Sequence, residues 1–219
     1  MKILINAKEM LDDFDRYILI DLRSKSEYGA AHISGAVSLP ADDAPFKDGA
    51  KLVTETAWAA LLGSCGITRD TALVAYDDGA SGRAVARFWY VAKHYGHRDV
   101  FILDGGYPAA SGILPTTADV PYVVPAIYAT KVTQGYFIGL DEILMNYDRI
   151  TFLDVRSPEE FVGDDLRDNP RGGHLRGAIL AVMDNFFADT PGQSFASPKK
   201  LAQVINNLGM RKKDLIITY

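Results

Sequence analysis

Cysteine is nearly absent from this sequence, with Cys65 the single one in 219 residues. One cysteine excludes an intrachain disulfide and a cysteine-rich zinc cluster, and it fits a reducing compartment. Long apolar runs are also lacking, and none approaches the roughly 20 residues that a membrane-spanning helix needs. The apolar stretch at residues 3–5 is too short for a secretory signal. These absences predict a cytoplasmic protein without a membrane segment.

Positive charge is in short supply as well. The formal net charge is −5, with 23 Lys and Arg against 28 Asp and Glu. A dedicated nucleic-acid binder usually has a basic balance or patch, so that class is not expected and any anion site has to be local. Apolar residues make up 48% of the chain, which is enough for a sizeable core. The length is comfortable for two domains.

The chain contains an internal repeat. Residues 10–24, MLDDFDRYILIDLRS, recur without a gap as residues 143–157, ILMNYDRITFLDVRS, and residues 66–76 align in the same way on residues 209–219. Between these segments the second copy has a polar insertion around residues 162–173. The first copy then continues with another helix and strand that have no counterpart in the second copy. The repeat therefore predicts two related domains, of which the second is incomplete.

The residue pattern alternates between strands and helices. Apolar runs at residues 18–20, 73–75 and 100–103 are typical of strands buried on both faces of a parallel sheet. Apolar side chains at helical spacing follow Arg83, and Ser197 is the N-cap of a helix that begins with proline. The pattern predicts an α/β fold.

Proline and threonine gather between Gly112 and about Gly135, where helical periodicity is absent. Such a composition favours an extended connection. We therefore expect two domains, residues 1–115 and residues 136–219, joined by a linker over residues 116–135.

The stretch from Ala72 to Arg83, ALVAYDDGASGR, combines a strand, a glycine-bearing loop and a helix N-terminus. Backbone N–H groups in such a loop form a cradle for an anion or a thiolate. The strand recurs at residues 215–219. This stretch is the first candidate for a functional loop.

Three motifs carry a resemblance to a known family: the Asp-Leu-Arg-Ser at residues 21–24, the Tyr28-x-x-x-His32-Ile33-x-Gly-Ala stretch, and Leu-Asp-Gly-Gly-Tyr at residues 103–107. Together they resemble the rhodanese domain, whose tandem form is the thiosulfate and 3-mercaptopyruvate sulfurtransferase family. The resemblance implies two rhodanese-like domains, each a central parallel sheet flanked by helices. Ser34 departs from it, because the motif often has proline there.

The resemblance also implies the chemistry. In that family a cysteine follows the strand before the active loop and carries sulfur as a persulfide, from thiosulfate or 3-mercaptopyruvate to cyanide or a thiol acceptor. The first copy has Asp77 at this position, and the second copy places it directly after Tyr219. The chain as printed is therefore expected to lack the nucleophilic cysteine and to be inactive. It is either a fragment of an active sulfurtransferase or a noncatalytic binding or regulatory module, and the apolar strand at residues 215–219 favours the fragment.

Asp77 and Arg83 are expected to form a noncatalytic loop in the first domain. A carboxylate cannot hold a sulfane sulfur, so Asp77 is predicted to accept hydrogen bonds from the amides of residues 79–82 and to pair with Arg83. The Asp77-x5-Arg83 spacing is also that of the Cys-x5-Arg loop of cysteine phosphatases. Without the cysteine that chemistry is not available.

Arg167 and Arg171, in the insertion of the second copy, are the candidate residues for binding the substrate. The resemblance implies arginines in this insertion that bind the anionic sulfur donor, for which a guanidinium fork is well suited. The alternative is that both are solvated residues of a charged loop. His32 and His174 are expected to brace loops, and Cys65 to fill apolar space. The resemblance implies no cofactor, and no metal site is expected.

Overall fold

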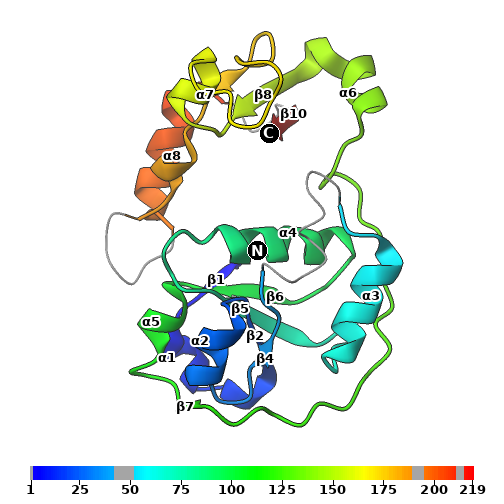
Figure 1. Ribbon diagram of the computed structural model, residues 1–219, viewed down its shortest axis with the longest axis vertical. Helices are drawn as coiled ribbons and strands as arrows, with labels where there is room; N and C mark the ends of the chain where they lie inside the picture. Colours follow the sequence, from blue (N-terminus) through cyan, green and yellow to red (C-terminus); the bar gives the residue numbers. More distant parts are fainter. Residues whose placement is uncertain (1, 42–51, 189–194, 211–214) are drawn as a thin grey trace. The chain divides into compact units, whose positions relative to one another are not determined.

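The computed structural model describes residues 2–41, 52–188, 195–210 and 215–219. The chain divides into two compact units, the first extending to Phe137 and the second beginning at Ile138. Figure 1 shows the elements of both units. Each unit is considered by itself below.

The first unit contains a five-stranded parallel sheet in the order β1-β6-β5-β2-β4. Its strands are β1 (Leu4–Ile5), β2 (Tyr17–Asp21), β4 (Val37–Ser38), β5 (Ala72–Tyr76) and β6 (Val100–Leu103). The three predicted apolar strands are thereby confirmed as β2, β5 and β6. Asp21 pairs in register with Tyr76, so the carboxyl ends of β2 and β5 lie at the same level. A small antiparallel pair joins β3 (His32–Ile33) to β7 (Thr116–Thr117).

Helices cover both faces of this sheet (Figure 1). They are α1 (Ala7–Leu11), α2 (Lys25–Ala30), α3 (Glu55–Ser64), α4 (Arg83–His94) and α5 (Gly106–Ala110), with a 3₁₀ turn η1 at Phe14–Arg16. Side chains of α1, α2 and α5 share one buried cluster with β2, β5 and β6. Trp58 of α3 packs against Phe88 of α4, with ring centroids 5.6 Å apart. The predicted helix after Arg83 is confirmed as α4.

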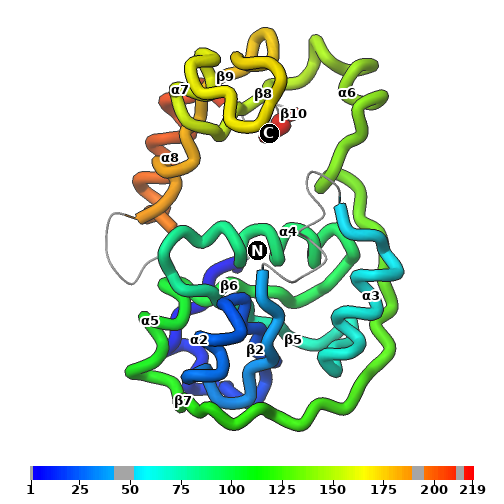
Figure 2. Tube along the Cα trace, in the orientation of Figure 1, coloured from blue at the N-terminus to red at the C-terminus, as the bar shows by residue number. Residues whose placement is uncertain are grey.

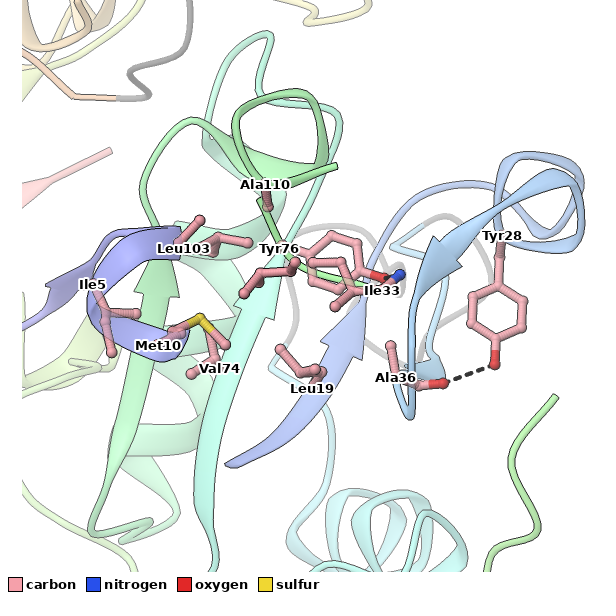
Figure 3. Close-up of a cluster of buried hydrophobic side chains, with 12 residues drawn as sticks. Ile5, Met10, Leu19, Tyr28, Ile33, Ala36, Val74, Tyr76, Leu103 and Ala110 are labelled. Atoms are coloured by element: carbon pink, nitrogen blue, oxygen red, sulfur yellow. Dashed lines mark hydrogen bonds between the residues drawn. The ribbon is translucent and has the colours of Figure 1, made fainter. Parts of the chain in front are cut away.

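The buried cluster reflects the two-residue period of the strands. Met10, Leu19, Val74 and Leu103 meet in it, all essentially without solvent exposure (Figure 3). Neighbouring side chains on a strand point to opposite faces, so the residues on either side of Val74 face the other layer. Burial of this apolar surface is the main source of stability for the first unit.

Residues 118–134, here called the strap, have no regular secondary structure but lie along the first unit (Figure 2). The amide of Ala126 donates to the carbonyl of Gly63 at 2.9 Å, and the amide of Lys131 donates to the carbonyl of Tyr95 at 3.0 Å. A Cβ on Gly63 would lie 2.6 Å from the Ala126 oxygen, so glycine permits this close approach. Most of the predicted linker is therefore held on the first unit by hydrogen bonds.

A buried histidine fastens the strap. Nε2 of His97 lies 2.8 Å from the carbonyl of Thr71, so this nitrogen carries the proton, and Nδ1 accepts from the hydroxyl of Tyr128 at 3.1 Å. His97 and Tyr128 are almost completely buried, and their rings are nearly parallel. Burial lowers the pKa of His97 from 6.5 to about 4, because the imidazolium would lose its hydration.

His97 is expected to make the first unit sensitive to acid. Below pH 6.5 the unfolded chain protonates this residue, whereas the folded protein does so only near pH 4. Folding therefore loses up to about 3 kcal/mol of stability as the pH falls through this window. Urea unfolding followed by tryptophan fluorescence measures the loss, since both tryptophans lie in the first unit. His97→Gln should remove this part of the pH dependence, and His174→Gln should not. Equal pH profiles for His97→Gln and the unmodified chain would contradict the assignment.

The second unit contains a parallel sheet in the order β10-β8-β9. Its elements are α6 (Leu140–Asn146), η3 (Tyr147–Arg149), β8 (Ile150–Asp154), α7 (Pro158–Val162), β9 (Ile179–Leu180), η4 (Met183–Phe186), α8 (Pro198–Asn207) and β10 (Leu215–Thr218). Ser197 caps α8 by accepting from the amide of Lys200 at 3.3 Å, as the sequence predicts. Tyr219 directly follows β10 and corresponds in the repeat to Tyr76, the last residue of β5.

Repeat-related positions differ in burial between the two units. Leu73 of β5 is fully buried, whereas its counterpart Ile216 of β10 is 37% exposed. Among the described residues β5 pairs with both β2 and β6, but β10 pairs with β8 alone. The second sheet therefore covers less of its apolar surface. Within the described ranges no helix has the length and apolar character needed to cross a bilayer.

Candidate functional site

A buried ion pair closes the carboxyl end of β2. Nε and Nη2 of Arg23 lie 3.1 and 2.6 Å from the two carboxylate oxygens of Asp21. Nη2 also donates to the carbonyl of Ala31 at 2.8 Å, which ties the loop after α2 to the strand end. Burial works against ionisation of Arg23, but the hydrogen bonds to Asp21 outweigh it and raise the pKa of the guanidinium. The pair therefore ties two segments of the first unit together at the end of β2.

Two tyrosines complete this cluster, and the sequence interpretation missed both. The hydroxyl of Tyr76 accepts from the amide of Ile33 at 3.2 Å (Figure 3) and hydrogen-bonds the carboxylate of Asp21. The ring of Tyr107 lies 3.7 Å from the guanidinium carbon of Arg23, a cation–π contact. Burial raises the pKa of Tyr76, so its hydroxyl keeps its proton. Tyr76 thus joins the end of β5 to the ion pair and to the histidine motif.

The second unit repeats the cluster. Arg156 places Nε and Nη2 at 2.9 and 2.5 Å from the carboxylate of Asp154, and it donates to the carbonyl of Gly173 at 2.8 Å. The hydroxyl of Tyr219 accepts from the amide of Leu175 at 2.9 Å. Burial opposes ionisation of Asp154, but hydrogen bonds from Arg156 and Tyr219 prevail and lower its pKa. An aspartate, an arginine and a tyrosine therefore meet at the end of the strand in both units.

The two motif histidines are held alike. His32 stacks on Tyr28 at 3.8 Å with Nδ1 2.8 Å from the Tyr28 carbonyl, and His174 stacks on Phe161 at 3.7 Å with Nδ1 2.8 Å from the Phe161 carbonyl. Nε2 of His32 lies 3.2 Å from the carbonyl of Asp119 in the strap. These contacts support the predicted bracing of loops.

Two carboxylates of the loop after β5 accept hydrogen bonds from the amides of the same loop. Oδ1 of Asp77 accepts from the amide of Gly79 at 2.9 Å, as predicted. The amide of Ala80 instead donates to Asp78 at 3.0 Å, so Asp77 does not collect all of the loop amides. Burial is the main reason that the pKa of Asp77 is raised. Arg83 is the exposed first residue of α4, at the end of this loop.

Close backbone packing fixes the loop against the start of α5. The amide of Tyr107 donates to the carbonyl of Asp77 at 2.9 Å. A Cβ on Gly79 would lie 2.4 Å from the Gly105 oxygen, and one on Gly106 would lie 2.6 Å from the Asp77 oxygen. Gly79 and Gly106 also have positive φ angles, so glycine is required at both. These contacts hold the loop after β5 against α5.

Cys65 lies away from this loop. It caps the C-terminus of α3, before β5 begins, whereas Asp77 follows the opposite end of that strand. The thiol is buried, and burial raises its pKa. These observations fit the predicted role as an apolar filler.

Arg167 and Arg171 lie in the loop that follows α7, and both are exposed. Nε of Arg167 is 3.1 Å from Oδ2 of Asp165, and Nη2 is 3.7 Å from Oε2 of Glu160. The structure thus brings Arg167 together with two carboxylates of its own unit. Within the described part of the chain, no three His, Cys, Asp or Glu side chains gather as metal ligands.

Comparison with known proteins agrees with this geometry. Residues 6–112 match the family described as the rhodanese-like domain. The first unit belongs to the rhodanese-like family. The match covers β2, the loop after β5 and the start of α5, and the internal repeat carries the first motifs of this rhodanese-like domain into the second unit.

Sequence relatives are sulfurtransferases by name. Thiosulfate sulfurtransferase of Corynebacterium glutamicum is 33% identical over 83% of this chain and 64% of its own length. Thiosulfate sulfurtransferase of Bos taurus is 27% identical over 76% and 59%, and 3-mercaptopyruvate sulfurtransferase of Mus musculus is 28% identical over 76% and 59%. This chain thus spans less than two thirds of the length of each of these three relatives.

Solved structures share the fold. SseA of Escherichia coli, a 3-mercaptopyruvate sulfotransferase, matches with a TM-score of 0.84 at 20% identity, over 100% of this chain and 88% of that one. YnjE matches with a TM-score of 0.83 at 19% identity, over 99% and 58%. The α/β rhodanese fold predicted from the sequence is confirmed by these likenesses.

Proposed function

We propose that this chain is the scaffold of a cytoplasmic sulfurtransferase. The enzyme moves a sulfane sulfur from thiosulfate or 3-mercaptopyruvate to cyanide or a thiol acceptor. In this proposal the sulfur is carried as a persulfide on a cysteine directly after Tyr219, the position that corresponds to Asp77 in the repeat. Cys65, the one cysteine among these 219 residues, is not at that position, so we expect no sulfur transfer from them alone.

One observation carries the proposal: the two strand ends have the same construction. Tyr76 and Tyr219 each close a parallel strand, bind an Asp–Arg pair and accept an amide of the histidine motif. The position after Tyr76 lies in the glycine-bearing loop, so the position after Tyr219 corresponds to it. Asp77 occupies this position in the first unit. A sulfur-carrying cysteine is therefore proposed at the corresponding position of the second unit.

The loop suits thiolate chemistry. Amides near a helix N-terminus stabilise a thiolate and lower its pKa. The thiolate attacks the outer sulfur of thiosulfate, the S–S bond breaks, and sulfite leaves with the electron pair. Cyanide then attacks the outer sulfur of the persulfide, forms thiocyanate and returns the thiolate. No redox partner is needed, because each displacement is balanced.

Arg167 and Arg171 are assigned to the donor within this proposal. A guanidinium offers paired N–H groups to the oxygens of a thiosulfonate or a carboxylate. Both side chains are exposed in the insertion between α7 and the histidine motif. Gly173 of this insertion accepts a hydrogen bond from Arg156, which follows the end of β8.

The alternative function is a noncatalytic rhodanese-like module that binds a partner or a small anion. The carboxylate of Asp77 in the first loop favours it for that unit, since this group cannot carry sulfur.

Sulfur-transfer assays separate the two functions. The printed chain should produce no thiocyanate from cyanide with either donor, because Cys65 is buried and lies outside the loop. The full-length protein should transfer sulfur, and serine in place of the cysteine after Tyr219 should abolish transfer. A gene in which another residue follows Tyr219, or a full-length protein inactive with both donors, would favour the noncatalytic module.

A further inference from the structure

Arg167 has an unusual backbone. Its φ is 48°, and among the described residues it is the one non-glycine residue with a positive φ. An L-residue in this region is strained, and the surrounding contacts have to hold it there. Contacts of the Arg167 side chain and backbone within the loop therefore hold this conformation.

Asp165 holds Arg167 at two points. Its Oδ1 accepts from the amide of Arg167 at 2.9 Å, and its Oδ2 lies 3.1 Å from Nε. One carboxylate thus fixes both the strained backbone and the guanidinium.

Glu160 provides a second carboxylate from α7. Its Oε2 is 3.7 Å from Nη2 of Arg167 and accepts from the amide of Ser157 at 3.3 Å, as part of the capping box of the helix. Glu160 is therefore anchored independently of Arg167. The guanidinium of Arg167 therefore contacts two carboxylates of its own unit.

We propose that Asp165 sets the anion affinity of Arg167, because it occupies the guanidinium until an anionic donor displaces it. This inference rests on the proposed function, in which Arg167 contacts the donor. An anion that presents two oxygens to the guanidinium fork can replace the carboxylate, whereas chloride offers a single contact. Asp165 therefore lowers the affinity of Arg167 for every anion, while the guanidinium fork itself favours anions that present two oxygens.

The expected competition is modest, because the pair is partly exposed. The side chains of Arg167 and Asp165 are 61% and 40% accessible. Exposed ion pairs of this kind change a binding constant by about two- to fivefold. Removing the charge of Asp165 should tighten thiosulfate binding by that factor.

Asp165→Asn in the 219-residue chain tests the role of Asp165 most directly. Asparagine keeps the side-chain oxygen that accepts from the Arg167 amide, so the loop conformation is preserved while the charge is lost. Asp168→Asn is the matched control, since it makes the same change of net charge in the same exposed loop. Thiosulfate is titrated into each variant, and binding is followed by NMR shifts of the Arg167 Nε–H.

Asp165→Asn should bind thiosulfate about two- to fivefold more tightly than the unmodified chain, and Asp168→Asn should match that chain. Arg167→Gln should lose the binding. Equal affinities for Asp165→Asn and Asp168→Asn would overturn the role of Asp165, and a lack of thiosulfate binding in every variant would do the same. Neither result decides whether the full-length protein transfers sulfur, which the thiocyanate assay measures separately.

Discussion

Asp77→Cys is expected to give the first unit a residue that takes up sulfur from thiosulfate. The new thiol lies where Asp77 now accepts from the amide of Gly79, next to the N-terminus of α4. The thiolate is the nucleophile in sulfur transfer, and these dipoles have to offset the burial that raises the pKa of Asp77 at the same position. Mass spectrometry after incubation with thiosulfate should show one added sulfur atom that cyanide removes. The unmodified chain should show none, so the variant turns an inert loop into a reactive one.

Asp77→Ser and Cys65→Ser are the controls for this experiment. Serine occupies the same position without a sulfur nucleophile, and the Asp77→Cys/Cys65→Ser double variant should retain the gain because Cys65 is buried elsewhere. Accumulation of thiocyanate from the double variant should exceed that from Asp77→Ser by at least about tenfold, as expected for an activated cysteine. An unmodified thiol at position 77 would show that the first loop does not correspond to a sulfur-carrying one.

Asp21→Ala is expected to destabilise the first unit by about 3–5 kcal/mol, because it leaves the buried guanidinium of Arg23 without its counter-ion. Both side chains of this pair are almost inaccessible, at 0% for Asp21 and 6% for Arg23. Tyr76 would also lose a hydrogen-bond partner. Urea unfolding with tryptophan fluorescence measures the effect, since Trp58 and Trp89 both belong to the first unit.

Asp70→Ala is the matched control for Asp21→Ala. Asp70 pairs with Arg98 at 2.9 Å, but the two side chains are 62% and 64% exposed. Such a pair contributes at most about 1 kcal/mol. Similar losses for the two variants would mean that the Asp21–Arg23 pair is not desolvated in solution. The double variant Asp21→Leu/Arg23→Leu should recover part of the loss, because it removes both buried charges.

The repeat explains why so much of the site could be predicted from sequence. Two ungapped matches identified the Asp-x-Arg pairs and the strand ends, and the apolar runs located β2, β5 and β6. These predictions depend on local periodicity, which the chain order preserves. Tyr76 and Tyr219 also coincide in the repeat, so the same comparison could have identified them.

Contacts between segments that are distant in the sequence could not be predicted from the repeat or from local periodicity. Tyr107 covers the guanidinium of Arg23, although the two are separated by most of the first unit. Tyr128 of the strap reaches His97, and proline-rich composition indicated only an extended connection there. Sequence spacing carries no information about which side chains meet after the chain has turned back on itself.

The insertion of the second copy shows the same limit at shorter range. Resemblance pointed to Arg167 as a donor residue, and the alternative was a solvated charge. The structure shows an exposed side chain that is nevertheless held by Asp165 and Glu160. A backbone with a positive φ brings these charges together, and no residue pattern predicts that conformation for an arginine.

The sequence by itself determined the α/β class, the two copies of the repeat and the position of Asp77 directly after an apolar strand of the first copy. Periodic burial and repetition are properties of neighbouring residues, so they can be read along the chain. Only the tertiary structure decided that Tyr76 and Tyr219 bind the buried Asp–Arg pairs and that Asp165 occupies Arg167. Hydrogen bonds and ion pairs depend on distance and desolvation, and folding sets both by bringing separate segments together.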